Sequence, residues 1–204
     1  MTDSIWDLSL RSVLEETASK SPTPGGGSVA PISAALGLGL VLMGLEVTRA
    51  KQASVELDEA IARGRRILDE IAAFADRDVA VFRAYMAALG LPKATESEQA
   101  LRTVARDQAV LAAARTPLSA AESCLRALAY AEAVAPVVQK NVWSDLLAGT
   151  DLLFGGLKAV LRTVDINLPA LRDPAARKAF AARAVQLEQD ASEIYARICT
   201  EPAA

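Results

Sequence analysis

The chain has 204 residues, the size of one domain, and its formal net charge is −3. Apolar residues make up 52 % of it and aromatic residues only 4 %, a balance that favours close-packed helices over a β-sandwich. It contains no histidine and two cysteines, which excludes histidine triads, histidine zinc sites and a disulfide framework. We therefore expect no metal and no nucleic-acid partner, and chemistry that uses carboxylates, hydroxyls, Lys, Arg, Tyr or backbone N–H groups.

No segment is typical of a targeting signal, because the stretch Met1–Trp6 is acidic and lacks an apolar core. The apolar run Val29–Leu45 comes nearest to a membrane span, but it contains Pro31 and falls short of the ~20 residues that a span needs. These features predict a buried core helix, no membrane partner and a cytoplasmic location.

Helix start and stop signals divide the chain in order. Ser28 is predicted to cap an apolar helix, with Pro31 in its first turn, where a missing N–H costs little. Thr95 opens a capping box, and Thr116-Pro117 predicts a break followed by a new helix. The predicted helices cover about 10–19, the stretch after Ser28, 54–89, 95–115, 117–135, 142–163 and 174–198.

No stretch of useful length shows the alternation of apolar and polar residues that is typical of a β-strand. The sequence therefore predicts an all-α, single-domain bundle of six or seven helices over residues 1–204. Two of the helices, the one after Ser28 and the one near 142–163, are apolar on most faces. Because one small bundle cannot easily cover both, we expect a homodimer that buries part of them.

The sharpest local feature is the run Pro24, Gly25, Gly26, Gly27 and Ser28 ahead of a helix. Successive glycines let backbone N–H groups turn toward one point, and a helix N-terminus adds partial positive charge. The run therefore suits a carboxylate, a phosphate or a developing oxyanion, with a tight connector as the equal alternative.

Acidic and amide side chains form the other candidates. Asn141, Ser144 and Asp145 open a helix that is otherwise apolar, where a cap is the commoner role but a buried carboxyl would suit a general base. Asp78 lies between apolar turns of the long helix, and a salt bridge is its commoner role. Lys93, after a helix-ending proline, reaches either an anionic ligand or water.

The eight residues Ser21–Ser28 resemble the signature of the cyclodeaminase/cyclohydrolase family, which includes formimidoyltetrahydrofolate cyclodeaminase and bacterial methenyltetrahydrofolate cyclohydrolase. The likeness continues in the same order over most of the chain, from about Leu10 to Leu168. The further matches are Met43, Thr48, Asp78, Val79, Phe82, Leu91-Pro92-Lys93, Thr116-Pro117-Leu118, Asn141, Ser144, Asp145 and Asn167.

The resemblance implies an all-α dimer that hydrolyses 5,10-methenyltetrahydrofolate to 10-formyltetrahydrofolate, with no cofactor besides the folate substrate. Asp145 would stabilise the cationic carbon and accept a proton from water, with Asp78 and Ser144 as further catalytic residues. The substrate-binding residues would be Pro24, Gly25, Gly26, Gly27, Ser28, Lys93 and Asn141. The alternatives are cyclodeamination of formimidoyltetrahydrofolate, in which ammonia leaves, a related reaction on another pterin or amidine, and a non-catalytic folate-binding protein.

The chain departs from the family pattern after the apolar helix. Glu46 stands where the family usually has Asn, Ser54 where it has Tyr, and a lysine-rich stretch is reduced to Arg49 and Lys51. Thr163 also replaces a common Asn. These changes weaken the expectation that an anionic glutamate tail binds in the usual way.

Overall fold

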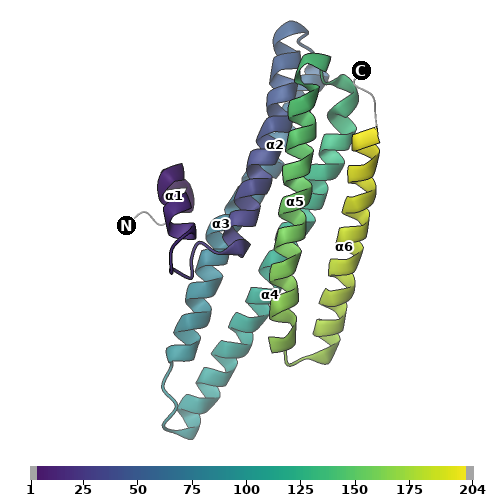
Figure 1. Ribbon diagram of the computed structural model, residues 1–204. Helices are drawn as coiled ribbons and strands as arrows, with labels where there is room; N and C mark the ends of the chain where they lie inside the picture. Colours follow the sequence, from purple (N-terminus) through teal and green to yellow (C-terminus); the bar gives the residue numbers. More distant parts are fainter. Residues whose placement is uncertain (1–3, 201–204) are drawn as a thin grey trace.

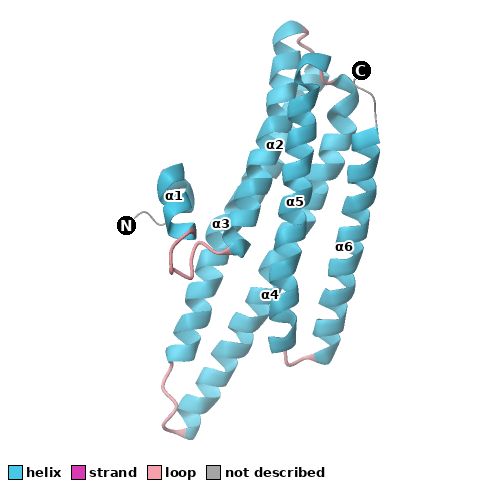
Figure 2. Ribbon diagram, in the orientation of Figure 1, coloured by secondary structure: helices cyan, strands magenta, loops and turns pink. Residues whose placement is uncertain are grey.

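Helices account for nearly all regular structure in the computed structural model, which describes residues 4–200 (Figures 1 and 2). No strand occurs in that range, so the all-α prediction is confirmed. The α-helices are α1 (Leu10–Thr17), α2 (Gly26–Lys51), α3 (Val55–Gly90), α4 (Glu96–Val134), α5 (Trp143–Asn167) and α6 (Pro174–Thr200). Both ends of the predicted domain, including part of the acidic start Met1–Trp6, lie outside the described residues.

From α2 to α6, successive long helices run in opposite directions along the bundle (Figure 1). The hairpin of α3 and α4 extends beyond the ends of α5 and α6 (Figure 1). As a result α2 begins partway along α3, and the loop from α1 reaches the bundle at that point.

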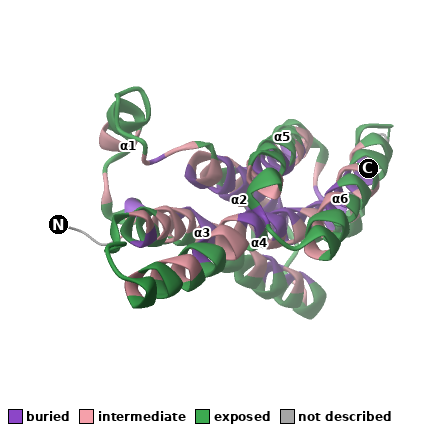
Figure 3. Cartoon of the chain, turned by 90° about the horizontal axis from the view of Figure 1, so that it is seen from below, coloured by how far each residue is buried: buried purple, intermediate pink, exposed green. Residues whose placement is uncertain are grey.

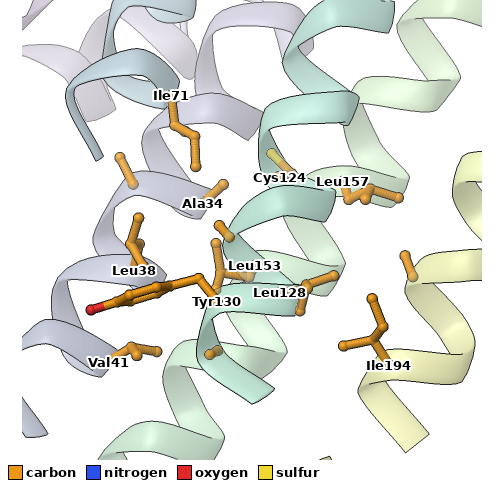
Figure 4. Packing of buried hydrophobic residues seen from close by; sticks show 14 of the residues in the cluster. Ala34, Leu38, Val41, Ile71, Cys124, Leu128, Tyr130, Leu153, Leu157 and Ile194 are labelled. Atoms are coloured by element: carbon orange, nitrogen blue, oxygen red, sulfur yellow. The ribbon is translucent and has the colours of Figure 1, made fainter. Parts of the chain in front are cut away.

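One continuous core fills the space between the long helices (Figure 4). Leu38 of α2, Leu128 of α4 and Leu153 of α5 are fully buried there, and Ile194 of α6 closes one side. Buried residues lie on the inward faces and exposed ones on the outward faces (Figure 3). Each buried leucine stabilises the bundle by about 1.5–3 kcal/mol.

Glycines allow α2 and α5 to approach backbone to backbone. A Cβ on Gly37 would lie 2.6 Å from the carbonyl oxygen of Gly149, and one on Gly156 would lie 3.0 Å from that of Ala30. No side chain fits at these positions. The glycines in the sequence therefore determine where α2 and α5 come into close contact.

Within residues 4–200, α2 is the one helix whose length and composition would allow it to cross a membrane. In its most apolar stretch, 61 % of the residues are buried in the bundle. Core helices of soluble proteins have the same properties, so the burial favours the predicted core position.

Two of the predicted helix boundaries are wrong. Gly25, not Ser28, is the N-cap of α2, which begins three residues earlier than expected, so Pro31 lies inside the helix and not in its first turn. Thr116-Pro117 does not start a new helix, because α4 continues through it without a break. By contrast, the capping box at Thr95 is present with both of its hydrogen bonds.

The segment before α2 is held by one acid of α3. Asp76 accepts hydrogen bonds from the hydroxyl of Ser4 and the backbone N–H of Ile5, both at 2.7 Å. In contrast α1 buries no residue and projects from the bundle, with Leu10 78 % and Leu14 67 % exposed (Figures 1 and 3). The anchor at Asp76 positions the chain that leads to the glycine-rich loop.

Candidate active site

The glycine-rich loop brings the start of α2 against the middle of α3. A Cβ on Gly27 would lie 2.6 Å from Cγ and 2.8 Å from Oδ2 of Asp78. Only glycine therefore leaves room for this carboxylate at the first turn of α2. The sequence predicted an anion at this corner, and the structure places a carboxylate of the protein itself there.

A hydrogen bond from α2 fixes the orientation of that carboxylate. The Ser28 hydroxyl, which is fully buried, donates to Oδ2 of Asp78 at 2.7 Å. Burial raises the pKa of Asp78 above its ordinary value, and the hydrogen bond from Ser28 opposes part of that rise. No ion pair to Asp78 occurs within residues 4–200, so its charge is available to a ligand.

Asp78 lines a pocket of about 430 Å³, within the ~300–1,000 Å³ usual for small-molecule sites. The glycine-rich loop, α3, α4 and the end of α5 form its walls. Its lining residues are Pro22, Thr23, Gly26, Gly27, Asp78, Val81, Phe82, Tyr85, Val110, Ala113, Thr163, Ile166, Asn167 and Ala170. The pocket is therefore mainly apolar, with one carboxylate and two aromatic rings.

Asn167 connects the α4 and α5 walls of this pocket. Pro117 has no N–H, so the carbonyl of Ala113, one turn earlier in α4, lacks its helical donor. The Asn167 side-chain amide donates to that carbonyl at 3.0 Å and to the carbonyl of Thr163 at 2.8 Å. This interaction explains how α4 continues through a proline that the sequence predicts to be a break.

The structure brings together one half of the predicted site. Gly26 and Gly27 line the pocket with Asp78, Ser28 lies behind the carboxylate, and Pro24 and Gly25 form the adjoining turn. Lys93 is exposed in the loop between α3 and α4 and does not line the pocket. Its predicted role in binding substrate finds no support in the geometry of the single chain.

Asn141, Ser144 and Asp145 lie elsewhere in the chain. They precede or open α5, whereas the pocket includes the opposite end of that helix, near Asn167. Asn141 and Ser144 are exposed, and Asp145 is partly exposed. The expected meeting of Asp145 with the glycine corner therefore does not occur within one chain, because α2 and α5 are antiparallel and the two features lie at opposite ends.

Sequence reasoning missed Tyr85 and the α4 wall. Tyr85 follows Asp78 and Phe82 at helical spacing, so its position on the same face of α3 was a signal available in the sequence. Val110 and Ala113 carried no such signal, because only the packing of α4 against α3 brings them to the pocket. Within residues 4–200, no group of three or more Cys, Asp or Glu side chains is placed to hold a metal ion.

Fold and site together define an all-α protein with a half-buried acid in a mainly apolar pocket for a small molecule. The family model described as formiminotransferase-cyclodeaminase matches residues 9–186. The chain belongs to this family, which confirms the predicted membership.

Two relatives illustrate the range of the family. The chain is 32 % identical to a methenyltetrahydrofolate cyclohydrolase of Methylorubrum extorquens, over 81 % of this chain and 82 % of that protein. It is 30 % identical to the formimidoyltransferase-cyclodeaminase of Rattus norvegicus, over 92 % of this chain but 36 % of the rat protein. The chain thus spans about a third of the rat enzyme.

A solved structure shows the same fold. The crystal structure of formiminotetrahydrofolate cyclodeaminase from Thermotoga maritima superposes with a TM-score of 0.80, at 25 % identity and over 95 % of both chains. The relatives and the solved structure are named as enzymes, which supports an enzyme of this kind.

Proposed function

We propose that this protein hydrolyses 5,10-methenyltetrahydrofolate to 10-formyltetrahydrofolate, as a cytoplasmic homodimer without a further cofactor. The observation that carries the proposal is the half-buried carboxylate of Asp78, which lines the pocket without an ion-pair partner in residues 4–200. Such a carboxylate attracts a cationic ligand. The name of the Methylorubrum relative supports the choice of reaction.

The substrate supplies the matching charge. Its bridging carbon, bonded to N5 and N10, belongs to an amidinium cation, which a carboxylate stabilises by Coulomb attraction in a pocket of low dielectric. The cation in turn favours the ionised form of Asp78, which is the form that can accept a proton.

Hydrolysis then needs one water and one base. Water attacks the bridging carbon, and Asp78 accepts a proton from it as the C–O bond forms. The bond from carbon to N5 then breaks, and its electron pair on N5 takes up the proton of the adduct's hydroxyl group to give N5–H. The C=O bond of the formyl group forms as that proton leaves, the formyl group stays on N10, and Asp78 releases the first proton to solvent. A positioned base of this kind contributes typically 10²–10⁴-fold to the rate.

The pocket walls suit the remainder of a folate. Phe82 and Tyr85 follow Asp78 on the same face of α3 and offer aromatic surface to flat rings. Thr163 and Asn167 supply polar groups on the opposite wall. None of Glu46–Ser54, where the chain departs from the family pattern, lines the pocket, and Glu46 forms ion pairs with Arg49 and Arg65.

Cyclodeamination is the second candidate, favoured by the close superposition on the Thermotoga enzyme. The same pocket would hold formimidoyltetrahydrofolate, N10 would attack the formimino carbon, and ammonia would leave. The two reactions differ in nucleophile and leaving group, so direct assays of methenyl absorbance and of ammonia release separate them.

The test follows the decay of methenyl absorbance with purified protein at neutral pH. We expect Asp78→Asn to lower kcat by about 10²–10⁴-fold. Glu70→Gln is the matched control, because Glu70 is an acid of the same helix that pairs with Arg126 at the surface. A wild-type rate no faster than that of buffer, or an unchanged rate for Asp78→Asn, would refute the proposal.

Thermal unfolding of Asp78→Asn at pH 7 separates lost chemistry from lost folding. The pKa of Asp78 is higher in the folded than in the unfolded protein, so its ionisation opposes folding above the unfolded pKa. Because Asn removes that charge and still accepts the Ser28 hydrogen bond, we expect a Tm equal to or above that of wild type.

A further inference from the structure

The hairpin of α3 and α4 continues one wall of the pocket beyond the ends of α5 and α6 (Figure 1). Val110 and Ala113 line the pocket from α4. Arg106 precedes Val110 by four residues and Ala113 by seven, so it lies on the same face of the helix. Arg106 is thus one turn beyond the pocket, on the part of the hairpin that projects.

A contact between the two helices sets the register that places Arg106 level with Tyr85. Nη2 of Arg102 donates a hydrogen bond to the carbonyl oxygen of Leu89 at 2.8 Å, so these two residues lie side by side in the antiparallel hairpin. Tyr85 is one turn before Leu89 on α3, and Arg106 is one turn after Arg102 on α4. Because Tyr85 lines the pocket, Arg106 stands at the end of the pocket that is away from Asp78.

The hairpin beyond Asp78 is positively charged. Residues 79–95 and 99–106 contain no acidic residue, and their basic residues are Arg83, Lys93, Arg102 and Arg106. The side chain of Arg106 is exposed and forms no ion pair within residues 4–200. The pocket therefore has a carboxylate near one end and an unpaired guanidinium beyond the other, an arrangement that suits a ligand with a cationic and an anionic end.

The proposed substrate has its charges in the same order. Its reacting carbon is cationic, and its far end is a glutamate tail that carries carboxylates. In an extended substrate, the bridging carbon and the first carboxylate of the tail are about 10 Å apart at ordinary bond lengths. Asp78 and Tyr85 are seven residues apart on α3, which is also about 10 Å along the helix axis. A substrate with its cationic carbon at Asp78 thus brings its first tail carboxylate level with Arg106.

The stretch Glu46–Ser54, where the sequence departs from the family pattern, offers the tail little positive charge. Arg49, one of its two basic residues, forms ion pairs with Glu46 and Asp58, so its charge is already compensated. No residue of this stretch lines the pocket. Arg106, by contrast, is unpaired within residues 4–200 and adjoins the pocket, so it is the better placed partner for a carboxylate.

We propose that Arg106 binds the first carboxylate of the substrate's glutamate tail, and that the tail continues outward along the hairpin of α3 and α4. The proposal rests on the proposed function and extends it, since it assigns the residue that recognises the anionic end of the substrate. A guanidinium suits this role because its planar fork donates two parallel hydrogen bonds to one carboxylate. The charge of the tail does not change during the reaction, so Arg106 contributes to binding and not to the chemical step.

Substrates that differ only in the tail test the assignment. The kinetic constants KM and kcat are measured for 5,10-methenyltetrahydrofolate with one glutamate, with five glutamates, and with the single glutamate converted to its uncharged diamide. We expect Arg106→Gln to raise KM about fivefold for the monoglutamate, the effect of one exposed charge pair, and at least as much for the pentaglutamate. The value of kcat should stay unchanged, and so should KM for the diamide.

Arg83→Gln is the matched control. Arg83 is an exposed arginine of the same hairpin and, like Arg106, forms no ion pair within residues 4–200. It lies roughly 160° around α3 from Val81 and Tyr85, which line the pocket, so it faces away from the substrate. The control removes the same charge from the hairpin, and we expect it to keep the wild-type KM for all three substrates.

The outcomes separate the tail site from the proposed function. If Arg106→Gln leaves KM unchanged for the charged substrates, or if the diamide or Arg83→Gln shows an equal rise, the tail site is overturned and the proposed function stands. A wild-type protein without activity on any of the three substrates refutes the proposed function. Equilibrium binding of p-aminobenzoyl-pentaglutamate, which has the tail but no pterin, then decides the tail site. Binding that Arg106→Gln weakens supports it, and binding that is absent or unaffected overturns it.

Discussion

Gly27→Ala is the substitution that the structure predicts most sharply. The added Cβ would overlap Oδ1 of Asp78, its nearest neighbour, and would lie 2.6 Å from Cγ, where ordinary contact begins at 3.4 Å, so the carboxylate must retreat by about 1 Å or more. A misplacement of about 1 Å costs on the order of 100-fold in rate, and we expect a loss of that size in kcat. Displacing the carboxylate also weakens its hydrogen bond from Ser28, which costs about 1.5–3 kcal/mol of folding stability.

The assay is the decay of methenyl absorbance, together with urea unfolding. Gly90→Ala is the matched control, since a Cβ at this exposed end of α3 meets nothing within 4 Å. The control should keep wild-type kcat and stability. If Gly27→Ala retains wild-type kcat, the carboxylate position is not what limits the reaction, and the assignment of Asp78 is wrong.

Two further substitutions test hydrogen bonds of the site. Ser28→Ala removes the bond that lowers the pKa of Asp78, so that pKa rises further and the acidic limb of the pH–rate profile should move to higher pH. Asn167→Ala leaves the carbonyl of Ala113 without a donor and should cost about 1–3 kcal/mol in urea unfolding. In a Pro117→Ala background the helical N–H is restored, and the same substitution should cost less.

For each of these two substitutions, one result would contradict the prediction. An acidic limb that stays in place in Ser28→Ala would show that another group controls the rate. Equal costs of Asn167→Ala in the two backgrounds would show that the proline and the amide act independently, contrary to the geometry.

Local rules predicted the helices well. Thr95 caps α4 as its sequence indicates, because a cap is a contact between residues only a few positions apart. The predicted helix over about 54–89 likewise agrees with α3. The predicted helix break at Pro117 was wrong because the contact that compensates for this proline is not local. The amide that satisfies the carbonyl freed by this proline belongs to Asn167, 54 residues away from Ala113, and no local pattern shows that the two meet.

The sequence by itself determined the helical class, the exclusion of histidine chemistry, and the glycine-rich loop that leads into an apolar helix. The tertiary structure decided what the loop faces. Gly27 and Ser28 are separated from Asp78 by about fifty positions, and only the packing of α2 against α3 places the carboxylate in the space that glycine leaves. It also separated Asp145 from that corner within one chain, because antiparallel helices bring the start of one beside the end of the other.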